Sequence, residues 1–156
     1  PARMSIEELF DSLRDFLEPV AQQKKIRIVT DCDPDCYVSA DYELLYRMLL
    51  NLLLNALRET PTDGAVTLKA RTVGEDVLID VEDNGPGIRP EQVSRIFDPM
   101  FSTSREGCGL GLPIVKRVVD SHRGKISVSS SSSGTKFKIS IPHNMEVVRE
   151  ALACSR

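Results

Sequence analysis

Apolar residues recur at helical spacing in three stretches of the chain, and the first carries a clear start signal. A helix is expected over 5–24, because Ser5 and Glu8 form a capping box at its beginning. The same periodicity predicts helices over 41–59 and 110–121. Each of these helices is expected to bury one apolar face against another layer of the protein.

Between the helices, apolar and polar residues alternate in short runs that predict strands. The runs over 66–70 and 77–81 are expected to pair as an antiparallel hairpin. The serine run 129–133 is predicted to be a hairpin turn ending at Gly134, because it lies between two matching strand patterns. Further strands are expected at 26–30, 37–39, 126–128 and 137–141. Together the elements predict a two-layer α/β sandwich, with one mixed, mostly antiparallel sheet packed on one side by helices.

Composition is that of a single globular domain. The chain has 156 residues, of which 41% are hydrophobic, and this is enough for one core. We expect the domain to span 1–142 and 143–156 to be a C-terminal tail. The sequence shows neither a signal peptide nor a stretch long enough to span a membrane. We therefore expect a cytoplasmic fragment of a longer protein, and the sequence leaves open whether that parent protein is anchored in a membrane. The net charge of −3, with scattered Lys and Arg, argues against nucleic acid as a partner.

The four cysteines do not form the pattern of a zinc site. Cys32 and Cys36 are separated by three residues and have neither a second pair nor a nearby histidine, so reduced thiols are expected. His122 and His143 are interpreted as surface or helix-end residues, because neither has the neighbours of a metal ligand or a nucleophile.

Two glycine-rich segments indicate a nucleotide site. Asp83-Asn-Gly-Pro-Gly87 follows a predicted strand, and Gly107, Gly109 and Gly111 precede a predicted helix. Glycine lets backbone N–H groups approach phosphate oxygens closely, and a helix N-terminus favours negative charge. The carboxylate of Asp83 can accept a hydrogen bond from the exocyclic amine of adenine.

A third segment, Asn51-Leu-Leu-Leu-Asn55, supplies polar groups on a helix. The spacing of four residues places Asn51 and Asn55 on one side of the helix, with Arg58 close to Asn55. A carboxamide oxygen suits Mg²⁺ that already carries triphosphate oxygens, since Mg²⁺ needs few protein ligands. A role for Asn51 and Asn55 only as caps or surface residues of the helix is disfavoured, because asparagine is a poor residue for a helix interior.

These segments follow one another in an order that resembles a known domain. Asn51 to Ala56, Asp83 to Ile88, Phe97 to Phe101, Gly107 to Leu112 and Gly134 to Phe137 resemble the N, G1, F, G2 and GT boxes of the sensor histidine kinase catalytic domain. This domain belongs to the GHKL superfamily, with the Bergerat ATP-binding fold. The short segment between Phe97 and Gly107 is similar to that of nitrogen-regulation kinases.

The resemblance implies a role for each matching residue. Asp83 would recognise adenine with support from Thr135, Asn55 would coordinate Mg²⁺, and Asn51 and Arg58 would lie near the phosphates. The segment between Phe97 and Gly107 would be a lid over ATP. The implied nucleotide-binding residues are Asn51, Asn55, Arg58, Asp83, Gly85, Gly87, Ile88, Phe97, Ser102, Thr103, Arg105, Gly107, Cys108, Gly109, Leu110, Gly111, Leu112 and Thr135.

The lid departs from the family pattern at three positions. Met100 stands where Phe is usual, Ser104 where Lys is common and Cys108 where Thr is common. Arg105 follows Ser104 and can supply the missing charge. The departures leave open whether full kinase activity is kept.

The resemblance implies a kinase rather than an ATP hydrolase. In the gyrase and MutL branches, a glutamate four residues before the metal-binding Asn activates water, and Asn51 at that position cannot act as a general base. The implied function is donation of the γ-phosphoryl of Mg·ATP to a histidine on a separate dimerisation hairpin of the same protein. A response regulator receiver domain is the second implied partner. A monomeric fragment of a homodimeric parent is expected. A nucleotide-dependent binding module and a serine kinase of the anti-sigma-factor type remain alternatives.

Overall fold

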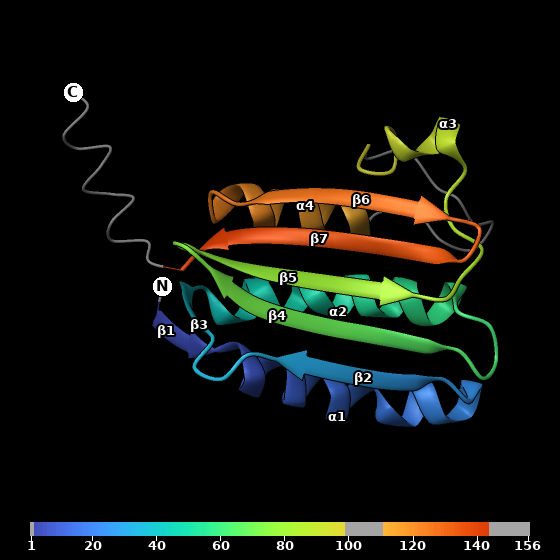
Figure 1. Ribbon diagram of the computed structural model, residues 1–156, viewed down its shortest axis with the longest axis horizontal. Coiled ribbons are helices and arrows are strands. Elements are labelled where there is room, and N and C mark those ends of the chain that lie inside the picture. Colours follow the sequence, from blue (N-terminus) through green and yellow to red (C-terminus); the bar gives the residue numbers. More distant parts are fainter. Residues whose placement is uncertain (1, 99–110, 144–156) are drawn as a thin grey trace.

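The computed structural model describes residues 2–98 and 111–143, in which helices are interspersed with strands and pairs of strands (Figure 1). The order is β1 (Ala2–Ser5), α1 (Ile6–Lys24), β2 (Arg27–Cys32), β3 (Tyr37–Ala40), α2 (Tyr42–Glu59), β4 (Ala65–Val73), β5 (Asp76–Asp83), α3 (Pro90–Val93), α4 (Gly111–Ser121), β6 (Lys125–Ser131) and β7 (Gly134–Pro142).

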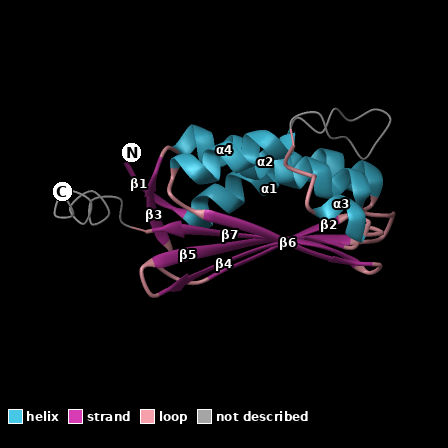
Figure 2. Cartoon of the chain, turned by 90° about the horizontal axis from the view of Figure 1, so that it is seen from above, coloured by secondary structure: helices cyan, strands magenta, loops and turns pink. Residues whose placement is uncertain are grey.

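Five of the strands form one sheet in the order β2-β4-β5-β7-β6. Strands β2 and β4 run parallel, and the other neighbours are antiparallel. Helices α1, α2 and α4 cover one face of this sheet (Figure 2). The predicted two-layer sandwich with a mixed, mostly antiparallel sheet is therefore confirmed. The predicted hairpin is confirmed, but its turn is shorter than expected, because Ser129, Ser130 and Ser131 belong to β6 and only 132–133 form the turn.

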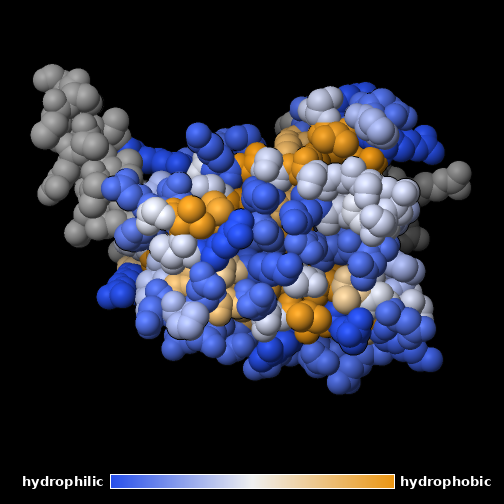
Figure 3. Space-filling model, in the orientation of Figure 1, coloured by the Kyte–Doolittle hydropathy of each residue, from blue (hydrophilic) through white to orange (hydrophobic). Residues whose placement is uncertain are grey.

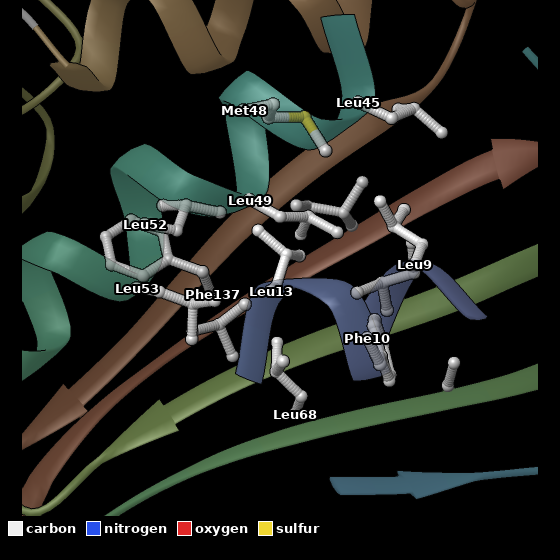
Figure 4. Close-up of a cluster of buried hydrophobic side chains, with 14 of the residues drawn as sticks. Leu9, Phe10, Leu13, Leu45, Met48, Leu49, Leu52, Leu53, Leu68 and Phe137 are labelled. Atoms are coloured by element: carbon white, nitrogen blue, oxygen red, sulfur yellow. The ribbon is translucent and has the colours of Figure 1, made fainter. Parts of the chain in front are cut away.

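The apolar stripes of α1 and α2 form the core together with the inner face of the sheet. Full burial of one such side chain stabilises the fold by about 1.5–3 kcal/mol. The close-up in Figure 4 shows the meeting of these layers, with side chains from both helices, β4 and β7. The labelled core residues include Leu9, Leu13, Leu45, Leu49, Leu52, Leu68 and Phe137, and all are buried.

Side chains cap both long helices. Ser5 accepts a hydrogen bond from the backbone N–H of Glu8 at 3.3 Å, as its capping box predicts. Asp41 accepts one from Leu44 N–H at 3.1 Å at the start of α2. At the other end of α2, the ammonium of Lys24 donates to the carbonyl of Arg58 at 3.3 Å, where a cation complements the helix dipole.

Three features differ from the sequence-based expectations. Strand β1 was not predicted, and it pairs with β3 in a separate two-stranded sheet, where the guanidinium of Arg3 lies 4.3 Å from the ring centre of Tyr37. The short helix α3 was also missed, because four residues are too few to show a period. His122 lies at the end of α4 as expected, but it is buried rather than on the surface.

The outer face of the sheet is polar. Figure 3 shows this face as mostly hydrophilic, with a few apolar side chains between charged ones. Glu82 on β5 lies 3.7 Å from the ammonium of Lys69 and 3.1 Å from that of Lys136. Such exposed ion pairs add little to stability, and their charged groups keep this face hydrated. Among the described residues, no helix has the length and apolar character needed to cross a membrane.

Candidate functional site

Asp83 is the most constrained polar residue at one end of the sheet. It is the last residue of β5, and only 9% of it is exposed. Its Oδ1 accepts hydrogen bonds from the N–H of Gly85 at 2.8 Å and from the N–H of Thr135 at 3.3 Å. Within residues 2–98 and 111–143, both bonds fall on Oδ1, which leaves Oδ2 for a ligand.

The surroundings of Asp83 disfavour its negative charge. Burial raises the pKa of this carboxyl above its ordinary value, and the neighbouring Glu59 raises it further. The N–H groups of Gly85 and Thr135 act in the opposite direction. A ligand amine that donates to Oδ2 would further stabilise the carboxylate, so the site is suited to a neutral hydrogen-bond donor such as an adenine amine.

The loop after Asp83 is held against the β6–β7 hairpin. The N–H of Ile88 donates to the hydroxyl of Ser130 at 2.7 Å, and this hydroxyl lies 3.1 Å from that of Thr135. Gly87 has a φ of +83°, and a Cβ added there would lie 2.0 Å from the carbonyl oxygen of Ser131. Only glycine therefore fits this close approach.

A cavity of about 210 Å³ opens between this loop, α2 and α4. It brings together Asn55 from α2, Asp83 from β5 and Leu112 from α4, which are far apart in the sequence. The residues that line it are Asn55, Glu59, Asp83, Pro86, Gly87, Ile88, Arg89, Gln92, Ile96, Leu112 and Thr135. Six of the predicted nucleotide residues are among them. A second, shallower hollow of about 350 Å³ is lined by the serine hairpin and contains no residue of α2.

The polar residues of α2 are placed unequally around the cavity. Asn55 lines it, and its Oδ1 accepts a hydrogen bond from the guanidinium of Arg58 at 2.7 Å. Arg58 itself is exposed beside the cavity. Asn51 is half-buried on the same side of the helix, one turn before Asn55, and does not line the cavity.

The remaining predicted residues fall into two groups. Phe97 packs edge-on against Phe137, with the ring centres 6.4 Å apart, so it anchors the segment before the lid in the core. Gly111 is the first residue of α4, and Gly85 is buried below the loop. Outside the described residues lie Ser102, Thr103, Arg105, Gly107, Cys108, Gly109 and Leu110, together with Met100 and Ser104 of the lid.

Sequence reasoning missed the supporting Ser130 and five residues that line the cavity, namely Glu59, Pro86, Arg89, Gln92 and Ile96. Glu59 follows Asn55 by four residues, so the helical spacing places it on the same face and could have indicated it. Ser130 stands inside a run of five serines, and nothing in the sequence distinguishes it from its neighbours. Only the fold shows that its hydroxyl holds Ile88.

The part of the chain that forms the cavity matches a known protein family. Residues 40–145 match the family described as histidine kinase-, DNA gyrase B-, and HSP90-like ATPase. The chain belongs to this family. The match covers every element of the site, from α2 to β7.

Relatives and structural neighbours are sensor histidine kinases. Sensor histidine kinase CusS of Escherichia coli (strain K12) is 40% identical over 136 residues, which cover 82% of this chain and 28% of CusS. The catalytic domain of histidine kinase ThkA superposes with a TM-score of 0.85 at 29% identity, covering 91% of this chain and 95% of that domain. ThkA in complex with the response regulator protein TrrA gives a TM-score of 0.82 at 28% identity, covering 93% of this chain and 42% of ThkA.

These comparisons confirm the assignment to the ATP-binding catalytic domain of sensor histidine kinases. The chain spans 28% of the length of CusS. The likeness to the short lid of nitrogen-regulation kinases stays a prediction, because the lid lies outside the described residues.

Proposed function

We propose that this chain binds Mg·ATP in the 210 Å³ cavity and donates the γ-phosphoryl group to a histidine on a dimerisation hairpin of the same protein. The observation that carries the proposal is the placement of Asp83 and Asn55 around one cavity. Asp83 would accept from the adenine amine, and Asn55 would face the phosphates. Phosphoryl transfer of this kind depends on positioning and charge stabilisation rather than on covalent chemistry by the protein.

The residues fit a magnesium ion that arrives with the triphosphate. The carboxamide oxygen of Asn55 is a hard, neutral ligand of the type that Mg²⁺ accepts. In the described part of the chain, no group of three or more His, Cys, Asp or Glu side chains could hold a metal by itself. Asn55 would therefore be the metal ligand, and the ion would neutralise charge that develops on the phosphates. Arg58, beside Asn55, would bind a phosphate oxygen.

The side chains of the site favour transfer of the γ-phosphoryl group to a protein over hydrolysis of ATP. Asn51 has no basic group to activate water. Glu59 does line the cavity, but its charge acts on Asp83 and so lies towards the expected adenine end. A water at the γ-phosphate would thus lack a general base from α2.

The boundaries of the domain and its partners follow from the same function. We propose that residues 1–142 are the catalytic domain, that 143–156 are a tail, and that the fragment is a cytoplasmic monomer of a homodimeric parent. The phosphorylated hairpin would pass its phosphate to a response regulator receiver domain, and ThkA, which this chain resembles, forms a complex with such a regulator. The net charge of −3 argues against nucleic acid as a partner.

The test is transfer of radioactive phosphate from γ-labelled ATP. The chain alone should remain unlabelled, because His122 is buried and hydrogen-bonded and His143 has no acceptor motif. A separately supplied dimeric hairpin from its parent protein should acquire an acid-labile label. Label on the fragment alone would contradict the assignment.

The same assay separates the alternatives. An Asp83→Asn variant is the matched control, because its weaker nucleotide binding should strongly reduce labelling at limiting ATP while the fold is kept. No label on the hairpin, with nucleotide binding intact, would favour a binding module instead. Acid-stable label on a partner serine would favour a serine kinase of the anti-sigma-factor type.

A further inference from the structure

Two cysteine side chains meet at the end of the sheet opposite to the nucleotide cavity. Cys32 is the last residue of β2, where it pairs with Ala70 of β4. The sulfur of Cys36 accepts a hydrogen bond from the hydroxyl of Thr72 at 3.7 Å. Ala70 and Thr72 are two residues apart on β4, so their side chains lie on the same face. Both sulfurs therefore lie over one short stretch of β4. The loop that joins β2 to β3 lies on the side of the N-terminus in Figure 1.

The backbone holds both ends of the loop that joins these cysteines. The carbonyl of Cys36 accepts a hydrogen bond from the N–H of Ile6 at 3.0 Å, at the first turn of α1. The N–H of Asp33 donates to the carbonyl of Ala70 at 3.0 Å. The loop is thus fixed to α1 and to β4, and the two thiols are positioned before any ligand arrives.

Two acidic side chains lie close enough to Cys32 to act on its thiol. The charges of Glu7 and Asp33 both reach this thiol, and Cys36 lies within hydrogen-bonding reach of it. A cation held between the two sulfurs would therefore be attracted by Glu7 and Asp33 as well.

We propose that Cys32 and Cys36 form a two-thiolate site for a soft, monovalent cation of the Cu(I) or Ag(I) type. Binding would break two S–H bonds, form two metal–sulfur bonds and release two protons to water, with no change of oxidation state. Thiolates select soft cations such as Cu(I). Structural zinc needs four ligands, and the described residues provide no third His, Cys, Asp or Glu with metal geometry here.

The test measures Cu(I) binding in competition with bathocuproine disulfonate, with ascorbate to keep the metal reduced. A background with Cys108→Ser and Cys154→Ser leaves only Cys32 and Cys36 among the four cysteines. This protein should remove one Cu(I) per chain from the chelator. Binding should tighten as pH rises, with a slope that reports two protons released for each ion.

Variants of the pair decide the outcome. Cys32→Ser and Cys36→Ala, each made in the same background, should weaken Cu(I) binding by about 100-fold or more, since even outer partners of metal ligands are worth about 10–100-fold. Cu(I) should raise the melting temperature of the background protein and not of either variant. Cys32 is half-buried, so its serine variant keeps the test valid even if the buried Cys36 variant fails to fold. Unchanged affinity in Cys32→Ser, or no Cu(I) taken from the chelator, would overturn the proposal.

Discussion

The guanidinium of Arg58 donates a hydrogen bond to the side-chain oxygen of Asn55 at 2.7 Å. This is the oxygen that we propose as the magnesium ligand. The bond orients the carboxamide towards the cavity and holds Arg58 close to where phosphates would lie. A metal that binds this oxygen must share it with Arg58 or release Arg58 towards a phosphate. The two residues are therefore expected to act as a unit.

Replacing Asn55 by Ala should separate metal binding from stability. Alanine is the better helix former, so the fold should remain nearly intact. Most of the Mg²⁺ dependence of triphosphate binding should be lost, because the proposed ligand oxygen is gone. Calorimetric titration of ATP with and without Mg²⁺ measures this directly.

The matched control for Asn55→Ala is Leu54→Ala, one residue earlier on α2 and 43% exposed. This variant removes surface from the same helix but no polar group, and Mg²⁺ dependence should persist in it. A collapse of thermal stability in Asn55→Ala, with Mg²⁺ dependence retained, would mean that Asn55 is structural.

Replacing Asp83 by Asn should weaken nucleotide binding without weakening the apo fold. The change replaces an acceptor by an amide, which costs about 2 kcal/mol of binding, or about 30-fold in affinity, if the adenine contact is buried. The folded-state pKa of Asp83 is raised, so its ionisation lowers stability above that pKa and costs nothing well below it. At neutral pH the Asn variant should therefore unfold at the same temperature or a higher one.

The raised pKa of Asp83 also sets a pH dependence for binding. The adenine contact needs the carboxylate, so affinity should fall as pH decreases through the raised pKa. This loss should begin at a higher pH than for an ordinary aspartate, whose pKa is about 3.9. Titrations of ADP at several pH values, repeated on Asp83→Asn, check this. The same acid loss in the variant would assign the effect to another group.

Replacing Ser130 by Ala should loosen the loop that contains Gly87. The change removes the acceptor of the Ile88 N–H and a partner of the Thr135 hydroxyl. A lost hydrogen bond of this kind costs about 1 kcal/mol, so nucleotide affinity should fall by about fivefold. Ser129→Ala is the matched control, since Ser129 is the exposed neighbour on the same strand. Equal losses in both variants would deny Ser130 a specific role.

Periodic and local signals explain which parts of the structure could be predicted. The spacing of Asn55 and Arg58 fixes their common face, because helix geometry alone determines it. Alternation predicted the pairing of β4 with β5 for the same reason, since each strand buries one face. The capping box at Ser5 depends only on residues within one turn.

Features that depend on distant contacts could not be predicted in this way. Strand β1 has only four residues, too few for their alternation to indicate a strand, and it exists because Tyr37 and its neighbours provide a pairing edge. Ser130 gains its role only when β6 is brought beside the loop of Ile88. The burial of His122 likewise depends on the approach of α2 to the end of α4.

His122 links the two helices that border the cavity. Its Nε2 accepts a hydrogen bond from the N–H of Asp41, the residue that caps α2, at 3.2 Å. Its Nδ1 lies 2.8 Å from the carbonyl of Val118 on α4, so Nδ1 carries the proton and donates. The buried ring therefore satisfies one backbone group of each helix.

Replacing His122 by Phe should destabilise the protein, because it keeps the ring volume but removes both polar atoms. The N–H of Asp41 would lose its acceptor, and a buried group left unpaired costs about 1–3 kcal/mol. Chemical denaturation of the apo protein measures this loss. His143→Phe, at the end of the described segment, is the control and should change stability by less than about 0.5 kcal/mol. If His122→Phe is as stable as the parent, then water satisfies the Asp41 N–H and His122 does not couple α4 to α2.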